Sequence, residues 1–168
     1  MKKFITFLFC GFLALFLGGC AKNLLNDSVD LVANFESDVR LKENNKEYEF
    51  KILHTPEGIN TITFKKPENI KGLTLSWENG KYKISMKELS GEFIAEPLTE
   101  NSSIGLVVKI LNSLNDRENL KYVSSQEGEN LFKGKCENID YEIKVNNQGK
   151  IMCIMIPERN ITTDFSYA

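Results

Sequence analysis

Few residues of this sequence have types and spacings that could perform chemistry. The chain has one histidine, His54, and no nucleophile motif accompanies it. A Ser-His-Asp triad would also require a carboxylate that orients the imidazole. His54 directly precedes a Thr-Pro turn, and we interpret it as a strand-end residue near the surface. We therefore predict no catalytic residue and no enzyme activity.

Metal, cofactor and nucleic-acid binding also lack the residues that they need. A zinc site takes several Cys or His ligands at close spacing, whereas His54, Cys136 and Cys153 are far apart in the sequence. Carboxylates such as Glu92 and Glu100 are typical of a solvated face, and no glycine-rich loop precedes a helix in a βαβ context. The net charge of −2 shows no basic excess. We predict no metal, no cofactor and no nucleic-acid partner.

The N-terminus contains a short motif with a chemical role. After a cationic start, residues 4–17 are almost wholly apolar. The segment Leu17-Gly18-Gly19-Cys20 lies at the end of this apolar stretch. A helix over this stretch would be roughly 21 Å long at about 1.5 Å per residue, which is short for a bilayer core of about 30 Å. Its length suits a secretory signal. The four residues resemble the lipobox of bacterial lipoproteins, in which small residues let the peptidase bind the backbone and the Cys thiolate takes up diacylglycerol.

The lipobox resemblance divides the chain into three parts. Residues 1–19 would be a cleaved lipoprotein signal peptide, residues 20–23 the lipidated Cys20 and a short tether, and residues 24–168 one domain. An ordinary signal peptide with a chance cysteine and an uncleaved anchor are the alternatives. Two or more acyl chains hold a protein stably on a membrane. We therefore expect a protein anchored through Cys20 at the outer face of the cytoplasmic membrane.

The rest of the chain alternates apolar and polar residues with a period of two, which is typical of half-buried strands. Two segments have a helical period instead: residues 23–34, and residues 104–114 with Ser102 or Ser103 as the N-cap. The expected strands are 35–41, 48–54, 59–65, 73–77, 82–86, 131–136, 139–145, 150–156 and 161–167. A weaker alternation runs from Phe93 toward Leu98.

One hairpin has an unambiguous register. Asn79-Gly80 is the preferred pair for a two-residue type I′ turn. A slip by one residue would turn a whole apolar set to solvent. The turn predicts the facing pairs Glu78 with Lys81, Trp77 with Tyr82, Leu75 with Ile84, and Leu73 with Met86.

The apolar strand faces and the helix are the candidate binding surface. They would either line a cavity for a lipid or pack as an ordinary core, and the sequence leaves both alternatives open. The candidate residues are Phe50, Phe64, Leu75, Trp77, Tyr82, Ile84, Met86, Val108 and Leu111.

Cys136 and Cys153 are expected to be free thiols. A loop over residues 146–149 would make Val145 face Lys150 and Cys153 face Glu142. The two cysteines would then lie on non-adjacent strands and on opposite faces, whereas a disulfide needs Cα atoms within about 7 Å.

A family resemblance rests on several segments. They are Lys66-Pro67-Glu68-Asn69-Ile70-Lys71-Gly72-Leu73-Thr74-Leu75-Ser76-Trp77, Phe132-Lys133-Gly134-Lys135, and residues 140–149 and 156–165. With the lipobox and the order of elements, they resemble the LolA/LolB superfamily of envelope proteins, and within it the clostridial, Gram-positive lipoproteins of the germination lipoprotein GerS type. The resemblance implies an α+β fold with a strongly curved antiparallel half-barrel sheet and helices on its concave side.

Three functions follow as hypotheses. The resemblance implies a membrane-anchored, non-catalytic envelope lipoprotein that acts through protein contact in sporulation or spore germination, with a cell-wall amidase as partner and the spore membrane as one location. The alternative is a binder or carrier of lipid or of another hydrophobic ligand in the envelope. An envelope hydrolase is the third, supported only by scattered carboxylates and His54. An open sheet edge would also allow a homodimer through strand exchange.

Overall fold

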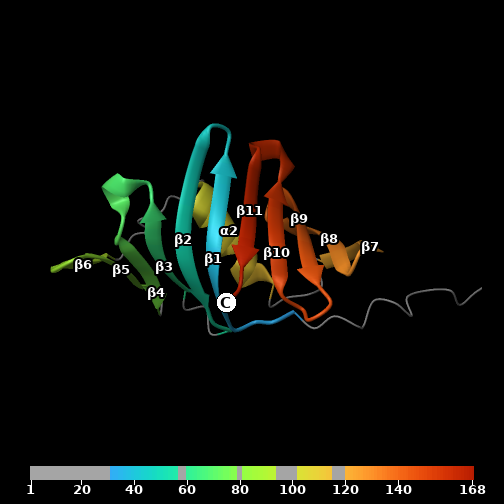
Figure 1. Cartoon of the computed structure of the whole chain (residues 1–168), viewed down its shortest axis with the longest axis horizontal. Helices are drawn as coiled ribbons and strands as arrows, with labels where there is room; N and C mark the ends of the chain where they lie inside the picture. Colours follow the sequence, from blue (N-terminus) through green and yellow to red (C-terminus); the bar gives the residue numbers. More distant parts are fainter. Residues whose placement is uncertain (1–30, 57–59, 79–80, 94–101, 115–119) are drawn as a thin grey trace, which may run out of the picture.

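The computed structural model describes residues 31–56, 60–78, 81–93, 102–114 and 120–168. Within them, all strands belong to one antiparallel sheet of the order β6-β5-β4-β3-β2-β1-β11-β10-β9-β8-β7, so the first and last strands of the chain lie side by side at its centre (Figure 1). The strands are β1 (Phe35–Glu43), β2 (Lys46–His54), β3 (Asn60–Lys66), β4 (Thr74–Glu78), β5 (Lys81–Met86), β6 (Leu89–Phe93), β7 (Leu120–Gln126), β8 (Glu129–Cys136), β9 (Ile139–Asn146), β10 (Ile151–Ile156) and β11 (Ile161–Ser166).

The expected α+β class with helices on the concave side is wrong. In the described residues, one large sheet of eleven strands is joined by a single α-helix, α2 (Ser103–Ser113), and by the short 3-10 turns η1 (Glu68–Ile70) and η3 (Pro157–Arg159). Most of the helix expected over residues 23–34 lies outside the described residues, and residues 31–34 are not helical. The sheet is larger than expected because β6 and β7 add a strand at each edge.

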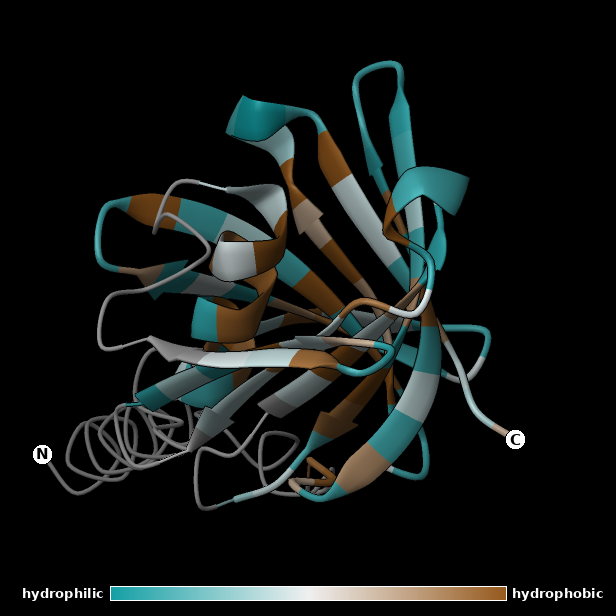
Figure 2. Cartoon of the chain, turned by 90° about the vertical axis from the view of Figure 1, so that its left-hand side faces the viewer, coloured by the Kyte–Doolittle hydropathy of each residue, from teal (hydrophilic) through white to brown (hydrophobic). Residues whose placement is uncertain are grey.

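The inner face of the sheet and α2 form one apolar core. Along β1 and β2, buried residues such as Leu41, Phe50 and Ile52 alternate with exposed charged residues, as the period of two predicted. In Figure 2 this alternation appears as brown and teal bands along the strands. The core cluster joins these strands to buried residues of α2, including Val107 and Leu111. The helix packs against this face because its apolar stripe has no other cover.

The start of α2 confirms the predicted cap. Ser102 is the N-cap residue, and its hydroxyl accepts a hydrogen bond of 3.1 Å from the backbone N–H of Gly105. Such a bond satisfies one of the N–H groups that the first helical turn leaves unpaired. The cap therefore determines where Ile104, the first apolar residue of the helix, meets the sheet.

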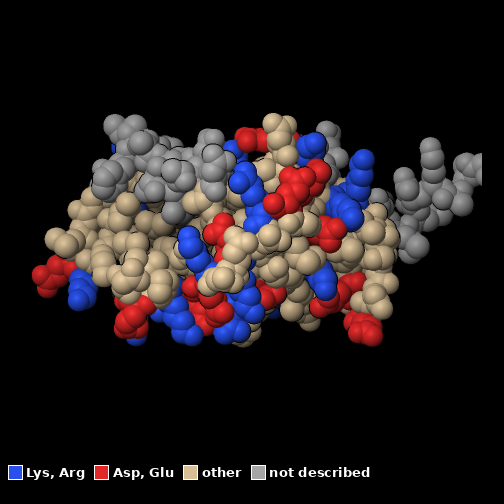
Figure 3. All heavy atoms as spheres, turned by 90° about the horizontal axis from the view of Figure 1, so that it is seen from above, with Lys and Arg blue, Asp and Glu red and all other residues tan. Residues whose placement is uncertain are grey.

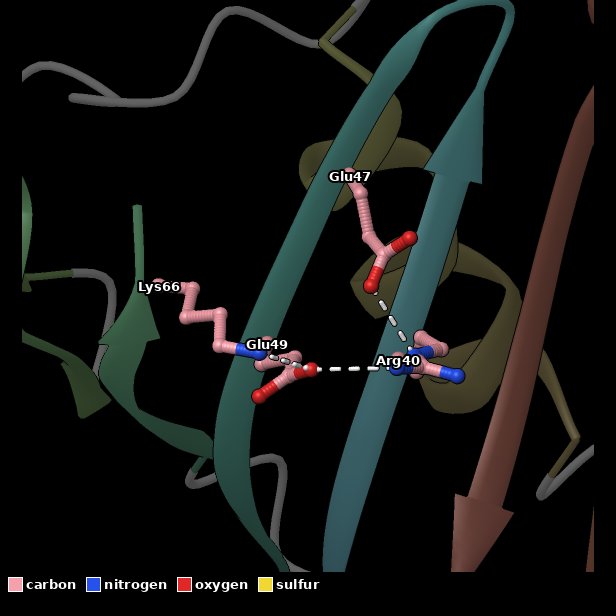
Figure 4. A network of polar contacts seen from close by, with 4 residues as sticks. All are labelled: Arg40, Glu47, Glu49 and Lys66. Carbon is pink, nitrogen blue, oxygen red and sulfur yellow. Dashed lines mark hydrogen bonds and ion pairs between the residues drawn. The ribbon is translucent and has the colours of Figure 1, made fainter. Parts of the chain in front are cut away.

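The outer face of the sheet is charged and solvated. Figure 3 shows acidic and basic side chains interspersed along one side of the molecule. In Figure 4, Arg40 reaches Glu47 at 3.0 Å and Glu49 at 3.3 Å, while Lys66 reaches Glu49 at 2.8 Å. The hydrogen bond from Lys66 is the largest of the effects that lower the pKa of Glu49. Exposed pairs of this kind stabilise a fold only slightly, so we interpret this network as a surface feature.

The predicted hairpin register is confirmed. Glu78 faces Lys81, Trp77 faces Tyr82 and Leu75 faces Ile84. The Trp77 and Tyr82 rings meet edge to face, with centroids 6.0 Å apart. Leu73 lies just before the first residue of β4, and the turn residues 79–80 lie outside the described residues.

Two strands differ from their predictions. β6 begins at Leu89, earlier than the alternation expected from Phe93, and residues 94–98 lie outside the described residues. β7 was not predicted at all. Most of its residues are exposed, and they include Ser124, Ser125 and Gln126. Such an edge strand carries little apolar alternation, so periodicity does not reveal it.

The β9–β10 register also differs from its prediction. Ile151 faces Val145 and Cys153 faces Lys144, with a register shift between them, so the expected pairs Val145–Lys150 and Cys153–Glu142 are wrong. An extra residue in one strand displaces every later pair, and no turn residue signals it.

The predicted separation of the cysteines is confirmed by the strand register. Cys136 faces Ile139, on the face of β9 that includes Tyr141, whereas Cys153 faces Lys144, on the opposite face. Directly opposed residues share a face of the sheet, so the two thiols cannot meet. Both are free and buried, and burial is the largest of the effects that raise the pKa of Cys153 to about 11.

Candidate functional site: an apolar groove at the start of the helix

The predicted cavity residues do not form one cavity. Phe64, Leu75 and Ile84 line a common groove beside the start of α2. Phe50 and Val108 are ordinary core residues, with 1% and 6% of their surfaces exposed. The structure therefore brings together three of the predicted residues and places the others elsewhere.

The remaining predicted residues lie outside this groove. Leu111 lines a different cavity near the end of α2. Trp77, Tyr82 and Met86 are half-buried on β4 and β5, beside the groove but not among its lining residues.

The groove has an apolar floor and a polar rim, and its volume is about 460 Å³. Volumes of this order are typical of sites for small organic ligands. We call its apolar lining residues the floor and its polar ones the rim: the floor comprises Phe64, Ile70, Leu73, Leu75, Ile84 and Ile104, and the rim Glu43, Lys46, Tyr48, Ser102 and Ser103.

The floor keeps part of its apolar surface in contact with solvent. Phe64 and Leu75 are buried at its base, with 4% and 3% of their surfaces exposed. Ile70, Leu73 and Ile84 are only half-buried, although all three pack against the core cluster. Covering apolar surface contributes about 25 cal/mol per Å². A ligand with an apolar body would therefore gain free energy by covering these three side chains.

A tight turn positions one wall of the groove. In and after η1, the N–H of Ile70 donates to Pro67 O at 3.1 Å, and the N–H of Leu73 donates to Ile70 O at 3.0 Å. The chain then returns to β3, where the N–H of Phe64 donates to Leu73 O at 2.9 Å. Gly72 has φ +82°, a conformation that L side chains rarely adopt. These bonds hold Ile70 and Leu73 beside Phe64.

Sequence reasoning missed several groove residues. Ile70 is a lone apolar residue within a polar turn, which was a usable signal because such a side chain gains by turning inward. Ile104 and Leu73 were recognised as apolar elements of the helix and the hairpin, but not as groove residues. Their common position depends on how α2 crosses the sheet, which local periodicity does not contain.

His54 is not the surface residue that we expected. Only 3% of its surface is exposed, because its ring stacks on Phe35 at 5.2 Å and its Nδ1 lies 2.8 Å from the carbonyl oxygen of Ala33. The strand end is covered by the chain segment that leads into β1.

The other predicted sites concern anchoring and metals. Leu17, Gly18, Gly19 and Cys20 lie outside the described residues. No group of His, Cys, Asp or Glu within the described ranges could hold a metal ion. In the same ranges, none of the helices has the length and apolar character needed to span a membrane.

Comparison with solved structures finds 22 chains that are similar to this one. No family model matches the sequence, and no curated protein sequence is similar to it. An uncharacterized conserved protein from Thermus thermophilus is similar in structure, with a TM-score of 0.49 and 10% identity over 79% of this chain and 77% of that chain. The LolA superfamily protein NE2245 from Nitrosomonas europaea is similar with a TM-score of 0.42 and 8% identity over 83% and 86% of the two chains. The second carries the superfamily name that the sequence resemblance indicated, but likenesses at this level assign no function.

Proposed function

We propose that this protein binds a lipid or another hydrophobic ligand in the apolar groove at the start of α2. The observation that supports this proposal most directly is the half-buried state of Ile70, Leu73 and Ile84 on the floor of a groove of about 460 Å³. Apolar side chains that remain partly exposed to solvent inside a concave surface offer apolar area that an apolar ligand can cover.

The groove chemistry indicates an amphiphilic ligand. An acyl chain or a similar apolar body would lie on the floor, against Leu73 and Ile84. Its polar end would reach the rim, where Lys46 and Glu43 are directly opposed at the end of the β1–β2 hairpin. The hydroxyl groups of Ser102 and Tyr48 add hydrogen-bonding groups on the same rim. This chemistry favours single-chain lipids over wholly apolar molecules.

We also propose that the chain is anchored at the outer face of the cytoplasmic membrane through Cys20. The support is the motif Leu17-Gly18-Gly19-Cys20 after the apolar residues 4–17. An anchor at this position would keep the groove close to its source of lipid. We expect the bound ligand to be held or presented, not chemically changed.

Regulation of a cell-wall amidase in sporulation or germination is the less favoured function. It depends on the sequence resemblance alone, whereas a specific groove in the structure supports the ligand-binding function. A protein partner and a homodimer both stay predictions from the sequence.

Photocrosslinking tests the ligand-binding proposal in the full chain. Cells that express the full chain are supplied with a fatty acid that carries a diazirine and are then irradiated. The labelled peptides are identified by mass spectrometry. We expect adducts on peptides that contain Leu73 and Ile84. Ile84→Lys should reduce them by about tenfold or more, because it introduces a charge into an apolar site.

The matched control is Ser85→Lys, which adds the same charge on the same strand. Ser85 faces Thr74 and Ser90, on the face opposite Ile84. Its labelling should stay within about twofold of the wild type. Equal loss in both variants, or labelling only outside the groove, would contradict the proposal.

A further inference from the structure

A second, smaller cavity lies at the opposite end of α2. Its volume is about 110 Å³. An engineered cavity of about 150 Å³ in another protein holds benzene, which has six heavy atoms, so this smaller space suits a molecule of roughly four heavy atoms. The lining residues are Leu31, Val32, Ala33, Phe35, His54, Leu111, Leu114 and Ile151.

Among the described residues of this lining, His54 is the one whose side chain can hydrogen-bond. Its Nδ1 lies 2.8 Å from the carbonyl oxygen of Ala33. A carbonyl oxygen only accepts, so Nδ1 carries the proton that it donates. In the neutral ring, Nε2 is then an acceptor with a free lone pair.

The Nε2 atom of His54 is buried and has no hydrogen-bond partner among the described residues. Most buried polar groups in proteins are paired, and an unpaired one calls for a specific explanation. Stacking on Phe35 with an interplanar angle of 16° fixes the ring, so Nε2 cannot simply turn toward solvent. The wall of this cavity therefore contains an acceptor that lacks a donor.

We propose that this cavity binds a small, neutral molecule with an apolar body and one hydroxyl group. The hydroxyl would donate to Nε2 of His54, and the apolar body would pack against Leu111, Leu114 and Ile151. A small branched alcohol such as 2-propanol has this chemistry. The pairing would supply the donor that the described residues do not provide.

The cavity is distinct from the groove of the proposed function. It lies beside Leu111 and Leu114 at the end of α2, whereas the groove lies beside Ser103 and Ile104 at its start. Among the described residues, the two share no lining residue. The proposal of a small-molecule site therefore does not depend on lipid binding in the groove, and the two can be tested separately.

The single histidine of the sequence makes the test direct. The full chain, labelled with ¹⁵N only at histidine and held in phosphatidylcholine vesicles, gives one pair of imidazole signals in solid-state NMR, both from His54. The probes are 2-propanol and acetone, which are similar in size, but only 2-propanol has a hydroxyl donor. We expect 2-propanol to shift the Nε2 signal and to bind roughly tenfold more tightly than acetone.

A cavity-filling variant provides the control. Ala33→Leu adds three carbon atoms to the wall and leaves His54 in place, so the shift of Nε2 that 2-propanol induces should be lost. The Nδ1 signal reports whether the bond to Ala33 persists in the variant. The proposal is overturned if 2-propanol leaves Nε2 unshifted, if both probes act alike, or if the shift survives in Ala33→Leu with Nδ1 unchanged.

Discussion

The two halves of the sheet present similar apolar faces but differ in how completely these are covered. In β9 and β10, Ile143, Ile154 and Ile156 each have 0% of their surface exposed. In β4 and β5, Trp77 and Ile84 point to the same inner face but are only half-buried. The alternating pattern thus determines which face turns inward, whereas the position of α2 determines how far that face is closed.

The contacts of α2 explain this difference. The helix contacts β8, and Lys109 forms an ion pair of 2.7 Å with Glu137 just after that strand. On the other side, its first apolar residue, Ile104, reaches the lining of the groove. The described residues close the β9–β11 half and leave the β3–β5 half with an apolar groove, which is why we place ligand binding there.

Removing buried volume should produce the largest difference between the halves. Ile154→Ala should lower the free energy of unfolding by about 2–5 kcal/mol, because it leaves a cavity in a closed core. Ile84→Ala should lower it by only about 1 kcal/mol, since the Ile84 side chain is already partly exposed to solvent. Urea unfolding of both variants measures the contrast. Equal losses would show that the two halves are equally closed.

The closed half should also reject added volume. A Cβ atom at Gly134 would lie 2.3 Å from the ring of Tyr141 on the neighbouring strand. Gly134→Ala should therefore lower the free energy of unfolding by about 1–3 kcal/mol, a cost typical of overpacking. The urea midpoint reports the loss. An unchanged midpoint would mean that Tyr141 moves aside freely, contrary to its burial.

The closed half should lose stability at high pH. Burial raises the pKa of Cys153 from 9.0 to about 11. Between these values the unfolded chain releases the thiol proton while the folded chain keeps it, so the free energy of unfolding falls as pH rises. The loss should be roughly 1–2 kcal/mol, because the thiol lies on the outer face, where solvent screens part of the effect.

The comparison of wild type with Cys153→Ala isolates the pH effect of this thiol. The variant should show a shallower fall in stability between about pH 9 and 11, whatever its stability at neutral pH. Burial also raises the pKa of Tyr167 from 10.0 to about 12, so both proteins should lose further stability between about pH 10 and 12. Identical slopes between pH 9 and 11 would contradict the burial of Cys153.

The outer face should respond least. Glu49→Gln removes the ion pairs to Arg40 and Lys66 on a solvated surface. We expect no measurable change in the urea midpoint at physiological salt, because exposed pairs are screened by water and ions. A clear loss would show that the charge network stabilises the sheet.

Local chemistry in the sequence was sufficient for some elements and not for others. The Asn79-Gly80 pair predicted the β4–β5 register correctly because the turn alone determines the facing pairs. The β9–β10 register was mispredicted because an irregularity between Ile151 and Cys153 shifts it. β7 was missed because an exposed edge strand needs few apolar residues.

The candidate site was predictable only in part. Phe64, Leu75 and Ile84 were predicted because alternation places them on the inner face. Their grouping with Ile70 and Ile104 was not predictable, because it depends on the position of η1 and α2 relative to the sheet. The predicted fold class was wrong for a related reason. The proportion of strands to helices depends on edge strands that the periodicity did not reveal.

The most direct test of ligand binding uses Trp77, the only tryptophan of the sequence. It follows the groove residue Leu75 by two positions on β4, roughly 7 Å at about 3.4 Å per residue. The full chain in phosphatidylcholine vesicles is titrated with 9,10-dibromostearic acid, whose bromine atoms quench nearby tryptophan, and with stearic acid as the unbrominated control. We predict quenching by the brominated acid only, with an apparent affinity about tenfold or more weaker in Ile84→Lys and within about twofold of the wild type in Ser85→Lys. Absence of quenching, or the same quenching in all three proteins, would contradict the assignment of the groove as a lipid site.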